Sequence, residues 1–202
     1  MNNYNDLIDF FIKIDSLKRT IRYSSCPDIV KESTADHSWK LTFMASILNE
    51  KIKNINPYHA IKLCLVHDLA ECITGDVDSF RITNKEITKE QKDKEEEKAI
   101  TTLKKDFPDI GKEIYNLWLE YQESKTVEAK YVKALDKLES LTHILSVNYI
   151  LVKDKLRAKH TATYADKAVE DFPQLKPMLE NIKKRLKEEY IKQGLKWEEE
   201  YN

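Results

Sequence analysis

Four polar residues stand in stretches of the chain that are otherwise apolar. His67 and Asp68 interrupt the run LCLVHDLAECI, and Asp136 interrupts VKALDKLESL. His37 falls on the same face of an amphipathic segment as Leu41 and the apolar residues of the next two turns. Because a buried carboxylate without a partner costs several kcal/mol, these four side chains need one another or a bound cation.

A single divalent metal ion would satisfy all four side chains. Two imidazoles and two carboxylates suit manganese, iron, cobalt, nickel or zinc, and these ligand types do not select among the metals. Adjacent helical residues point about 100° apart, so His67 and Asp68 can share an ion only if it lies beside the helix, between their two directions. Four protein ligands in an octahedral sphere leave two positions for water and a substrate oxygen, which indicates a catalytic site.

Three more polar residues could belong to the same site. Glu71 lies one helical turn after His67 and could orient water or carry a proton. Asp76, in the segment that follows, could approach the same ion, although a turn residue is the simpler interpretation. His143 is a conceivable extra ligand for a second metal, but a hydrogen-bonded polar residue on a helix flank is the favoured interpretation.

The elements that position these residues are all expected to be helices. Only 3 Gly and 5 Pro occur in 202 residues, and 34% of the residues are charged, which favours helices with solvated outer faces over a turn-rich β fold. Ser33 and Thr34 are interpreted as hydrogen-bonding residues at a helix start. Apolar periodicity predicts helices over residues 4–18, from about 33 to a break at 54–57, over 58–73, 85–105, about 109–122, 128–153 and about 175–198, with loops over 19–34 and 75–84.

Charge and hydropathy exclude several classes of protein. The formal net charge is −1, so the chain has no overall field that would attract nucleic acid or an anionic membrane. No apolar run reaches the ~18 residues that a membrane span needs, and the N-terminal segment lacks a basic targeting region. Cys26, Cys64 and Cys72 form no CxxC pair and are expected to be free thiols. We therefore expect a cytoplasmic protein that binds neither nucleic acid nor membranes.

The order of these residues resembles that of the HD-domain phosphohydrolases. The family places one His, then a His-Asp pair and then a lone Asp on separate helices, and here these are His37, His67–Asp68 and Asp136. The segments ESTADHSWK, LVHDLAECITGDV and EAKYVKALDKLESL resemble the branch that contains the 5′-deoxynucleotidases. The resemblance covers about residues 15–151.

This resemblance implies an all-α fold, namely an HD-domain helical bundle with a buried metal site. It implies one divalent metal ion, often manganese or cobalt, and hydrolysis of deoxynucleoside 5′-monophosphates to deoxynucleoside and phosphate. Homodimers are usual in this branch. We expect a single HD domain over residues 1–202, with the metal-site core at about 15–151 and C-terminal helices at about 155–202.

The resemblance also implies roles for individual side chains. The substrate-binding arginine of the family is best matched by Arg22, and Arg19 is its neighbour. Relatives carry a tryptophan beside or just after that arginine, whereas this chain has Tyr23, which can still stack on a base or sugar. The family's catalytic acids map onto Glu71 and Asp76, and its metal ligands onto His37, His67, Asp68 and Asp136.

Two alternatives to this activity stay open at the level of sequence. One is a different reaction at the same ion, as in a phosphodiesterase or a deoxynucleoside triphosphate triphosphohydrolase. The other is a non-enzymatic all-α interaction domain that uses its charged helices at 85–105 and 175–198 to bind partners. The second alternative gives no reason for a His-Asp pair inside the most apolar helix.

Overall fold

All regular secondary structure in the described part of the chain is helical. The computed structural model describes residues 4–24, 26, 29–147 and 155–202, and within these ranges the only extended pairing is an isolated bridge between Ile21 and Ser33. The prediction of an all-α fold is therefore confirmed. In chain order the elements are α1 (Tyr4–Ile14), η1 (Asp15–Lys18), α2 (Thr34–Leu48), η2 (Asn49–Lys51), α3 (Pro57–Val66), α4 (Glu71–Thr74), α5 (Ser79–Thr83), α6 (Lys89–Asp106), α7 (Pro108–Glu123), α8 (Val127–Ser146), α9 (Lys155–Thr163), α10 (Asp166–Val169), α11 (Lys176–Lys192) and η3 (Glu199–Tyr201).

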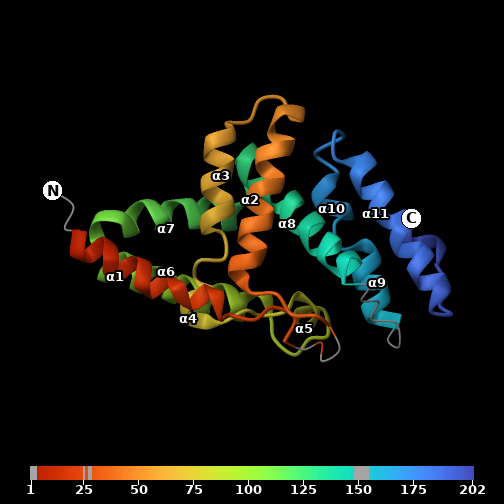
Figure 1. Cartoon of the computed structure of the whole chain (residues 1–202), viewed down its shortest axis with the longest axis horizontal. Coiled ribbons are helices and arrows are strands. Elements are labelled where there is room, and N and C mark those ends of the chain that lie inside the picture. The colour runs from red at the N-terminus through yellow and green to blue at the C-terminus, as the bar shows by residue number, and fades with distance from the viewer. Residues whose placement is uncertain (1–3, 25, 27–28, 148–154) are drawn as a thin grey trace.

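Four helices form the centre of the molecule. Helix α2 packs against α3 and α8, and α7 packs against the same two helices; Figure 1 shows α2 and α3 side by side, with α8 crossing them. Their facing sides bury Leu41, Ala45, Leu63 and Leu135 completely. Removal of this apolar surface from water, at about 25 cal/mol per Å², holds together the helices that carry the polar residues singled out above.

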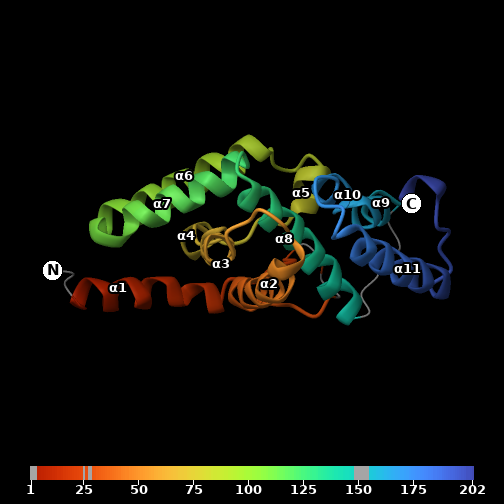
Figure 2. The same ribbon diagram turned by 90° about the horizontal axis from the view of Figure 1, so that it is seen from above.

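A second apolar cluster joins α1, α6 and α7 at the end of the molecule where the N-terminus lies (Figure 2). Phe10 of α1 and Trp118 of α7 are buried in it, together with Leu69 from the turn after α3. Gly111 allows α6 and α7 to approach closely, because a Cβ at this position would lie 2.5 Å from the Cα of Lys104. This cluster therefore anchors the segment that contains the His-Asp pair.

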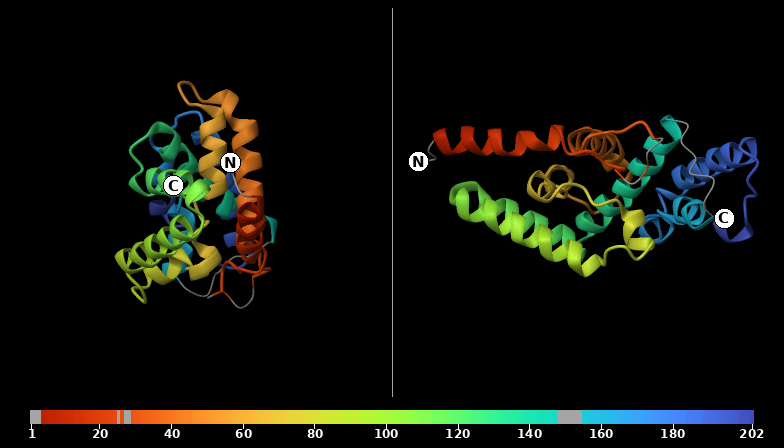
Figure 3. Two further views of the ribbon diagram at one scale, coloured as in Figure 1. Left: turned by 90° about the vertical axis from the view of Figure 1, so that its left-hand side faces the viewer. Right: turned by 90° about the horizontal axis from the view of Figure 1, so that it is seen from below.

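The C-terminal helices occupy the opposite end of the molecule (Figure 3). Helices α10 and α11 pack on α8, while α9 packs on α5 and η3. Tyr190 of α11 is buried and donates a hydrogen bond to the carbonyl of Ala158 in α9 at 2.8 Å. Within the described ranges, no helix has both the length and the apolar character to cross a membrane.

The single helix predicted over 58–73 is wrong, because the structure contains two helices, α3 and α4, separated by a turn. The His67 side chain causes the interruption. Its Nδ1 donates to the carbonyl of Cys64 at 2.8 Å, which in an uninterrupted α-helix would accept from the N–H of Asp68. The backbone then continues with tighter bonds, such as that from the Glu71 N–H to the Asp68 carbonyl at 3.0 Å.

Other predicted boundaries also differ from the structure. The expected loop 75–84 contains the short helix α5, whose five residues are too few to give a periodic pattern. The helix expected at 85–105 begins later because Thr88 accepts a hydrogen bond from the N–H of Gln91 and so caps α6. Helix α8 ends at Ser146, and residues 148–153 of the predicted helix 128–153 lie outside the described residues.

Candidate metal centre and adjoining cavity

Helices α2 and α8 and the end of α3 bring the four predicted ligands together. His37 lies near the start of α2, His67 directly follows α3, and Asp136 lies in the middle of α8. The Nε2 atom of His37 is 3.2 Å from Nε2 of His67 and 3.2 Å from Oδ1 of Asp136. Oδ2 of Asp68 is 3.1 Å from His67 Nε2 and 3.7 Å from His37 Nε2. We call these four side chains the ligand cluster.

The two histidines present the same ring nitrogen to the cluster. The Nδ1 of His67 donates to the Cys64 carbonyl, which can only accept. The Nδ1 of His37 donates to Oε2 of Glu139, whose other oxygen is 2.9 Å from Lys40 Nζ. Burial opposes ionisation of Glu139, but His37 and Lys40 hold the pKa of this carboxyl below its ordinary value. Both Nε2 atoms are therefore directed into the cluster, where a metal ion could bind them in place of a proton.

These atoms fit one divalent metal ion. The two Nε2 atoms lie 3.2 Å apart, so either a proton on one of them or a metal ion between them must offset the repulsion of their lone pairs. Ligand atoms about 2.1 Å from a common ion and at right angles to each other lie about 3.0 Å apart. The separations of 3.1 to 3.7 Å among the paired atoms of the ligand cluster are close to this value. Imidazole and carboxylate donors suit the transition metals named above.

The charges around the ligand cluster also favour a cation. Burial and the positive charge of Arg22 disfavour a charged imidazole, but hydrogen bonds to Asp136 and Glu139 outweigh them and raise the pKa of His37 to about 10. Burial opposes ionisation of Asp68, yet the adjacent His67 and Arg22 hold its pKa well below the ordinary value. Burial likewise opposes ionisation of Asp136, and the hydrogen bond to His37 lowers its pKa. Both carboxylates are therefore ionised at neutral pH.

Three side chains that sequence reasoning did not assign to the site support the predicted residues. Glu139 is fully buried three residues after Asp136. Like Asp136, it is a charged residue that interrupts an apolar helix, so the same sequence pattern could have indicated it. Tyr121 donates to Oδ2 of Asp136 at 3.2 Å, and only the fold brings it there from α7. Thr34, assigned from the sequence to the helix start, donates through Oγ1 to Oε2 of Glu71 at 2.8 Å.

Arg22 lies beside the ligand cluster and contacts several acidic groups. Its Nη1 is 3.1 Å from Oδ2 of Asp68 and 3.9 Å from Oδ1 of Asp76. Its Nε is 3.3 Å from Oε1 of Glu32, and its Nη2 donates to Oγ of Ser140 at 3.3 Å. The guanidinium is thus held in a fixed position at the edge of the ligand cluster.

The two predicted catalytic acids, Glu71 and Asp76, are close to the same arginine and differ in acidity from ordinary carboxyls. Burial, together with the charges of Asp68 and Asp76, raises the pKa of Glu71 well above its usual range. Burial also raises the pKa of Asp76 to about 6, although Arg22 opposes this shift. Burial therefore favours the protonated form of Glu71, whereas Asp76, with a pKa of about 6, is mostly ionised at neutral pH.

The structure separates the two arginine candidates. Arg19 pairs with Asp15 at 3.1 Å, its side chain is 71% exposed, and it is not brought to the ligand cluster.

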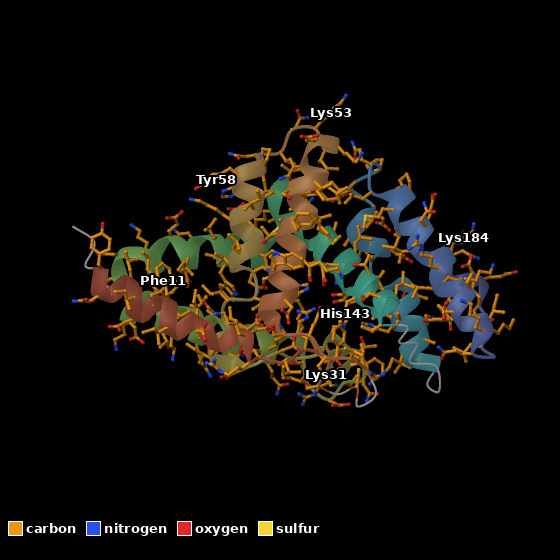
Figure 4. The ribbon with its side chains drawn as sticks, viewed as in Figure 1. Phe11, Lys31, Lys53, Tyr58, His143 and Lys184 are labelled. Carbon is orange, nitrogen blue, oxygen red and sulfur yellow. The ribbon has the colours of Figure 1, made fainter. Side chains whose placement is uncertain are left out.

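Tyr23 lines the cavity beside the cluster and adopts a left-handed backbone conformation with φ +58°. Its ring stacks on His143 at 5.3 Å, and His143, which Figure 4 labels on α8, donates through Nε2 to the carbonyl of Val30 at 3.1 Å.

A cavity of about 360 Å³ adjoins the ligand cluster. Asp68 and Asp136 reach its wall, and so do Arg22, Glu71 and Asp76. Its volume lies within the range of about 300–1,000 Å³ that is typical of small-molecule sites. The arrangement can therefore admit a small molecule beside the ligand cluster, a guanidinium and a buried carboxyl.

Comparison with known proteins identifies the family. The model of the HD domain matches residues 14–176, which is most of the chain. The chain belongs to the HD-domain family. The resemblance inferred from the sequence is thereby confirmed. Membership implies a divalent metal ion, and His37, His67 and Asp136 of this HD-domain protein form a group that could hold one.

Individual relatives agree with this assignment. The human protein named 5′-deoxynucleotidase HDDC2 is 36% identical over 138 residues, which are 67% of this chain and 65% of the human protein. A solved structure from Pyrococcus horikoshii is 28% identical with a TM-score of 0.68 and covers 88% of this chain and 99% of its own. A structure from Magnetospirillum magnetotacticum, named as a predicted metal-dependent phosphohydrolase, has a TM-score of 0.71 at 24% identity. The match covers 96% of this chain and 99% of the other. At this identity the match supports the fold alone.

Proposed function

We propose that this HD-domain protein is a metal-dependent phosphomonoesterase that converts deoxynucleoside 5′-monophosphates to deoxynucleoside and phosphate. The observation that carries the proposal is the convergence of two imidazole nitrogens and two carboxylates beside a cavity of about 360 Å³. The substrate class comes from the names of relatives such as the human protein, of which this chain spans 65%. A purely structural domain would have no need for such a group beside a cavity.

His37, His67, Asp68 and Asp136 are proposed to hold the metal ion. Glu139 fixes the ring of His37 through Nδ1, so that its Nε2 stays directed at the ion. A divalent ion in this position supplies Lewis acidity toward a phosphate oxygen and makes water nucleophilic at neutral pH. Manganese, cobalt, iron, nickel and zinc all suit this set of ligands, and we propose manganese or cobalt as the first metals to test.

Arg22 and Glu71 are proposed to act on the substrate. The guanidinium of Arg22 can donate two parallel hydrogen bonds to a phosphate group, a geometry that favours arginine over lysine. Glu71 accepts from Thr34 through Oε2, which leaves Oε1 to carry the proton. That proton can pass to the 5′ oxygen as the phosphorus–oxygen bond breaks. Asp76, ionised beside Arg22, helps to hold the guanidinium, and Tyr23 is proposed to contact the sugar or base.

The test is a screen of deoxyribo- and ribonucleoside monophosphates with manganese, cobalt and magnesium. Wild-type protein should release inorganic phosphate, whereas the variant Asp68→Ala should fold and lose activity. Release of pyrophosphate or triphosphate from nucleotides, or opening of cyclic dinucleotides, would favour the alternative reactions. Equal phosphate release by the variant and the wild type would refute the proposed metal centre.

We further propose that the protein forms a homodimer through its outer apolar surface. Trp39, Phe43 and Ile47 recur at intervals of one turn along α2 and are 69%, 56% and 54% exposed. Phe11 of α1 and Tyr58 of α3 are also exposed, and Figure 4 labels both at the outer surface. The Trp39 and Phe43 rings stack at 6.0 Å, and an exposed apolar stripe such as this one along α2 is typical of protein interfaces. Light scattering should give twice the mass of one chain; a monomeric mass at micromolar concentration would contradict this.

A further inference from the structure

The two ends of the cavity differ in chemistry. At one end the lysines belong to ion pairs along α6, Lys89 with Asp93 and Lys92 with Glu96. The other end lies between α5 and α9, which pack side by side (Figures 1 and 2). There the wall includes rings and aliphatic side chains from α5, α8 and the end of α9, together with the charged residues Lys137 and Arg157. The ligand cluster borders the same cavity.

We define the aromatic end by four residues: Phe80, Arg157, His160 and Tyr164. The Phe80 and His160 rings meet edge to face at 5.9 Å, and the His160 and Tyr164 rings lie 5.0 Å apart. The guanidinium carbon of Arg157 lies 3.8 Å from the centre of the Phe80 ring. Such a wall of flat, polarisable groups binds planar heteroaromatic molecules by stacking.

The His160 ring is an uncharged part of this wall. Its Nε2 is 3.2 Å from Oγ of Ser79, and its Nδ1 is 3.1 Å from Oγ1 of Thr83. Burial lowers the pKa of His160 to about 4, so the imidazole is neutral at physiological pH. With both nitrogens beside hydroxyl groups of α5, the ring contributes a flat surface to the cavity. Leu141 and Ile144 of α8, both buried, add apolar area to the same end.

We propose that the aromatic end is the subsite for the planar base of a nucleotide whose phosphate lies at the ligand cluster. The proposal rests on the proposed function and adds to it the residues that recognise the base. A second phosphate group is the alternative occupant, since Arg157 is a cation. Lys137, whose Nζ lies 3.9 Å from the centre of the Tyr164 ring, could join Arg157 in binding such a phosphate. The rings of Phe80, His160 and Tyr164 favour the base, because stacking on such rings strengthens the binding of a base about tenfold or more.

The test compares substrates with and without a base. Thymidine 5′-monophosphate and deoxyguanosine 5′-monophosphate are measured against 2-deoxyribose 5-phosphate, and the ratio of kcat/KM values gives the contribution of the base. The variants Arg157→Met and Phe80→Leu should each lower this ratio about tenfold, in line with the loss of one stacking contact. Arg185→Met, the same substitution at an exposed residue of α11, serves as the control and should leave the ratio unchanged.

A proportional loss on all three substrates, or no loss, would overturn the subsite. A loss greater for the base-free sugar phosphate would point to phosphate binding at Arg157 and would also overturn it. Equilibrium binding of thymidine and deoxyguanosine, which carry no phosphate to hydrolyse, tests the subsite even if no nucleotide is turned over. In that case, weaker nucleoside binding by both variants supports the subsite while the proposed function fails. Unchanged nucleoside binding overturns the subsite. Thermal unfolding of Phe80→Leu verifies its fold.

Discussion

Replacement of Tyr121 by phenylalanine should weaken divalent metal binding about tenfold. The buried hydroxyl stays protonated, because burial and the charge of Asp136 raise the pKa of Tyr121 well above its usual range, and it donates to Oδ2 of Asp136 at 3.2 Å. A hydrogen bond to a charged group contributes about 1.5–3 kcal/mol. This bond is longer than the usual O–H···O distance of about 2.7–2.8 Å, so we take the lower end of this range, about 1.5 kcal/mol, which is slightly more than tenfold in affinity.

The assay is a calorimetric titration of metal-free protein with manganese. Tyr131→Phe is the matched control, since Tyr131 is also buried but its hydroxyl has no hydrogen-bond partner among the described residues. The control should bind manganese as the wild type does, whereas Tyr121→Phe should bind it about tenfold more weakly, within the range of about 10–100-fold known for outer-shell partners. Equal affinities of the two variants would refute the idea that the Tyr121 hydroxyl orients the Asp136 carboxylate.

Two further predictions concern proton transfer and pH. Glu71→Gln should lower turnover of deoxynucleoside monophosphates about 100-fold or more. Turnover of 4-nitrophenyl phosphate should fall much less, because the nitrophenolate leaves without accepting a proton. Equal losses on both substrates would argue against proton donation by Glu71. His160, with a folded pKa of about 4, binds fewer protons when folded than unfolded. It should therefore lower the free energy of unfolding by about 1–3 kcal/mol as pH falls from about 6.5 to 4. Urea titrations of wild type and His160→Asn should differ in this pH slope; parallel slopes would contradict the assignment.

The ligand cluster could be predicted from the sequence because its members break apolar patterns. His67 and Asp68 in the most apolar segment, and Asp136 in a buried helix, are costly in a core unless they meet a cation. That reasoning needs only the pattern and the cost of burying charge. Which of two nearby arginines lies beside the cluster depends on the path of the loop before α2. The structure places Arg22 there and Arg19 on the surface.

Other features depend on contacts that a periodic pattern does not contain. At the break between α3 and α4, the His67 side chain hydrogen-bonds the Cys64 carbonyl, which in a continuous helix would accept from a backbone N–H. The change concerns a single hydrogen bond within an otherwise helical sequence. The hydrogen bonds from Tyr121 to Asp136 and from Thr34 to Glu71 join residues 15 and 37 positions apart. Such partners are set by how the helices pack, so the sequence showed the charged residues but not the groups that orient them.

The Glu139 carboxylate joins α8 to two residues of α2, His37 and Lys40. The ligand cluster lies next to this carboxylate and draws its members from α2, α8 and the segment after α3. A metal ion bound there would therefore cross-link chain segments that are far apart in sequence. Binding energy at such a cross-link adds to the free energy of unfolding, because the unfolded chain has no preformed site. Chelation should therefore do more than stop turnover. It should lower the melting temperature, which thermal unfolding would report, and loosen the contact between α2 and α8, which hydrogen exchange of their amides would report.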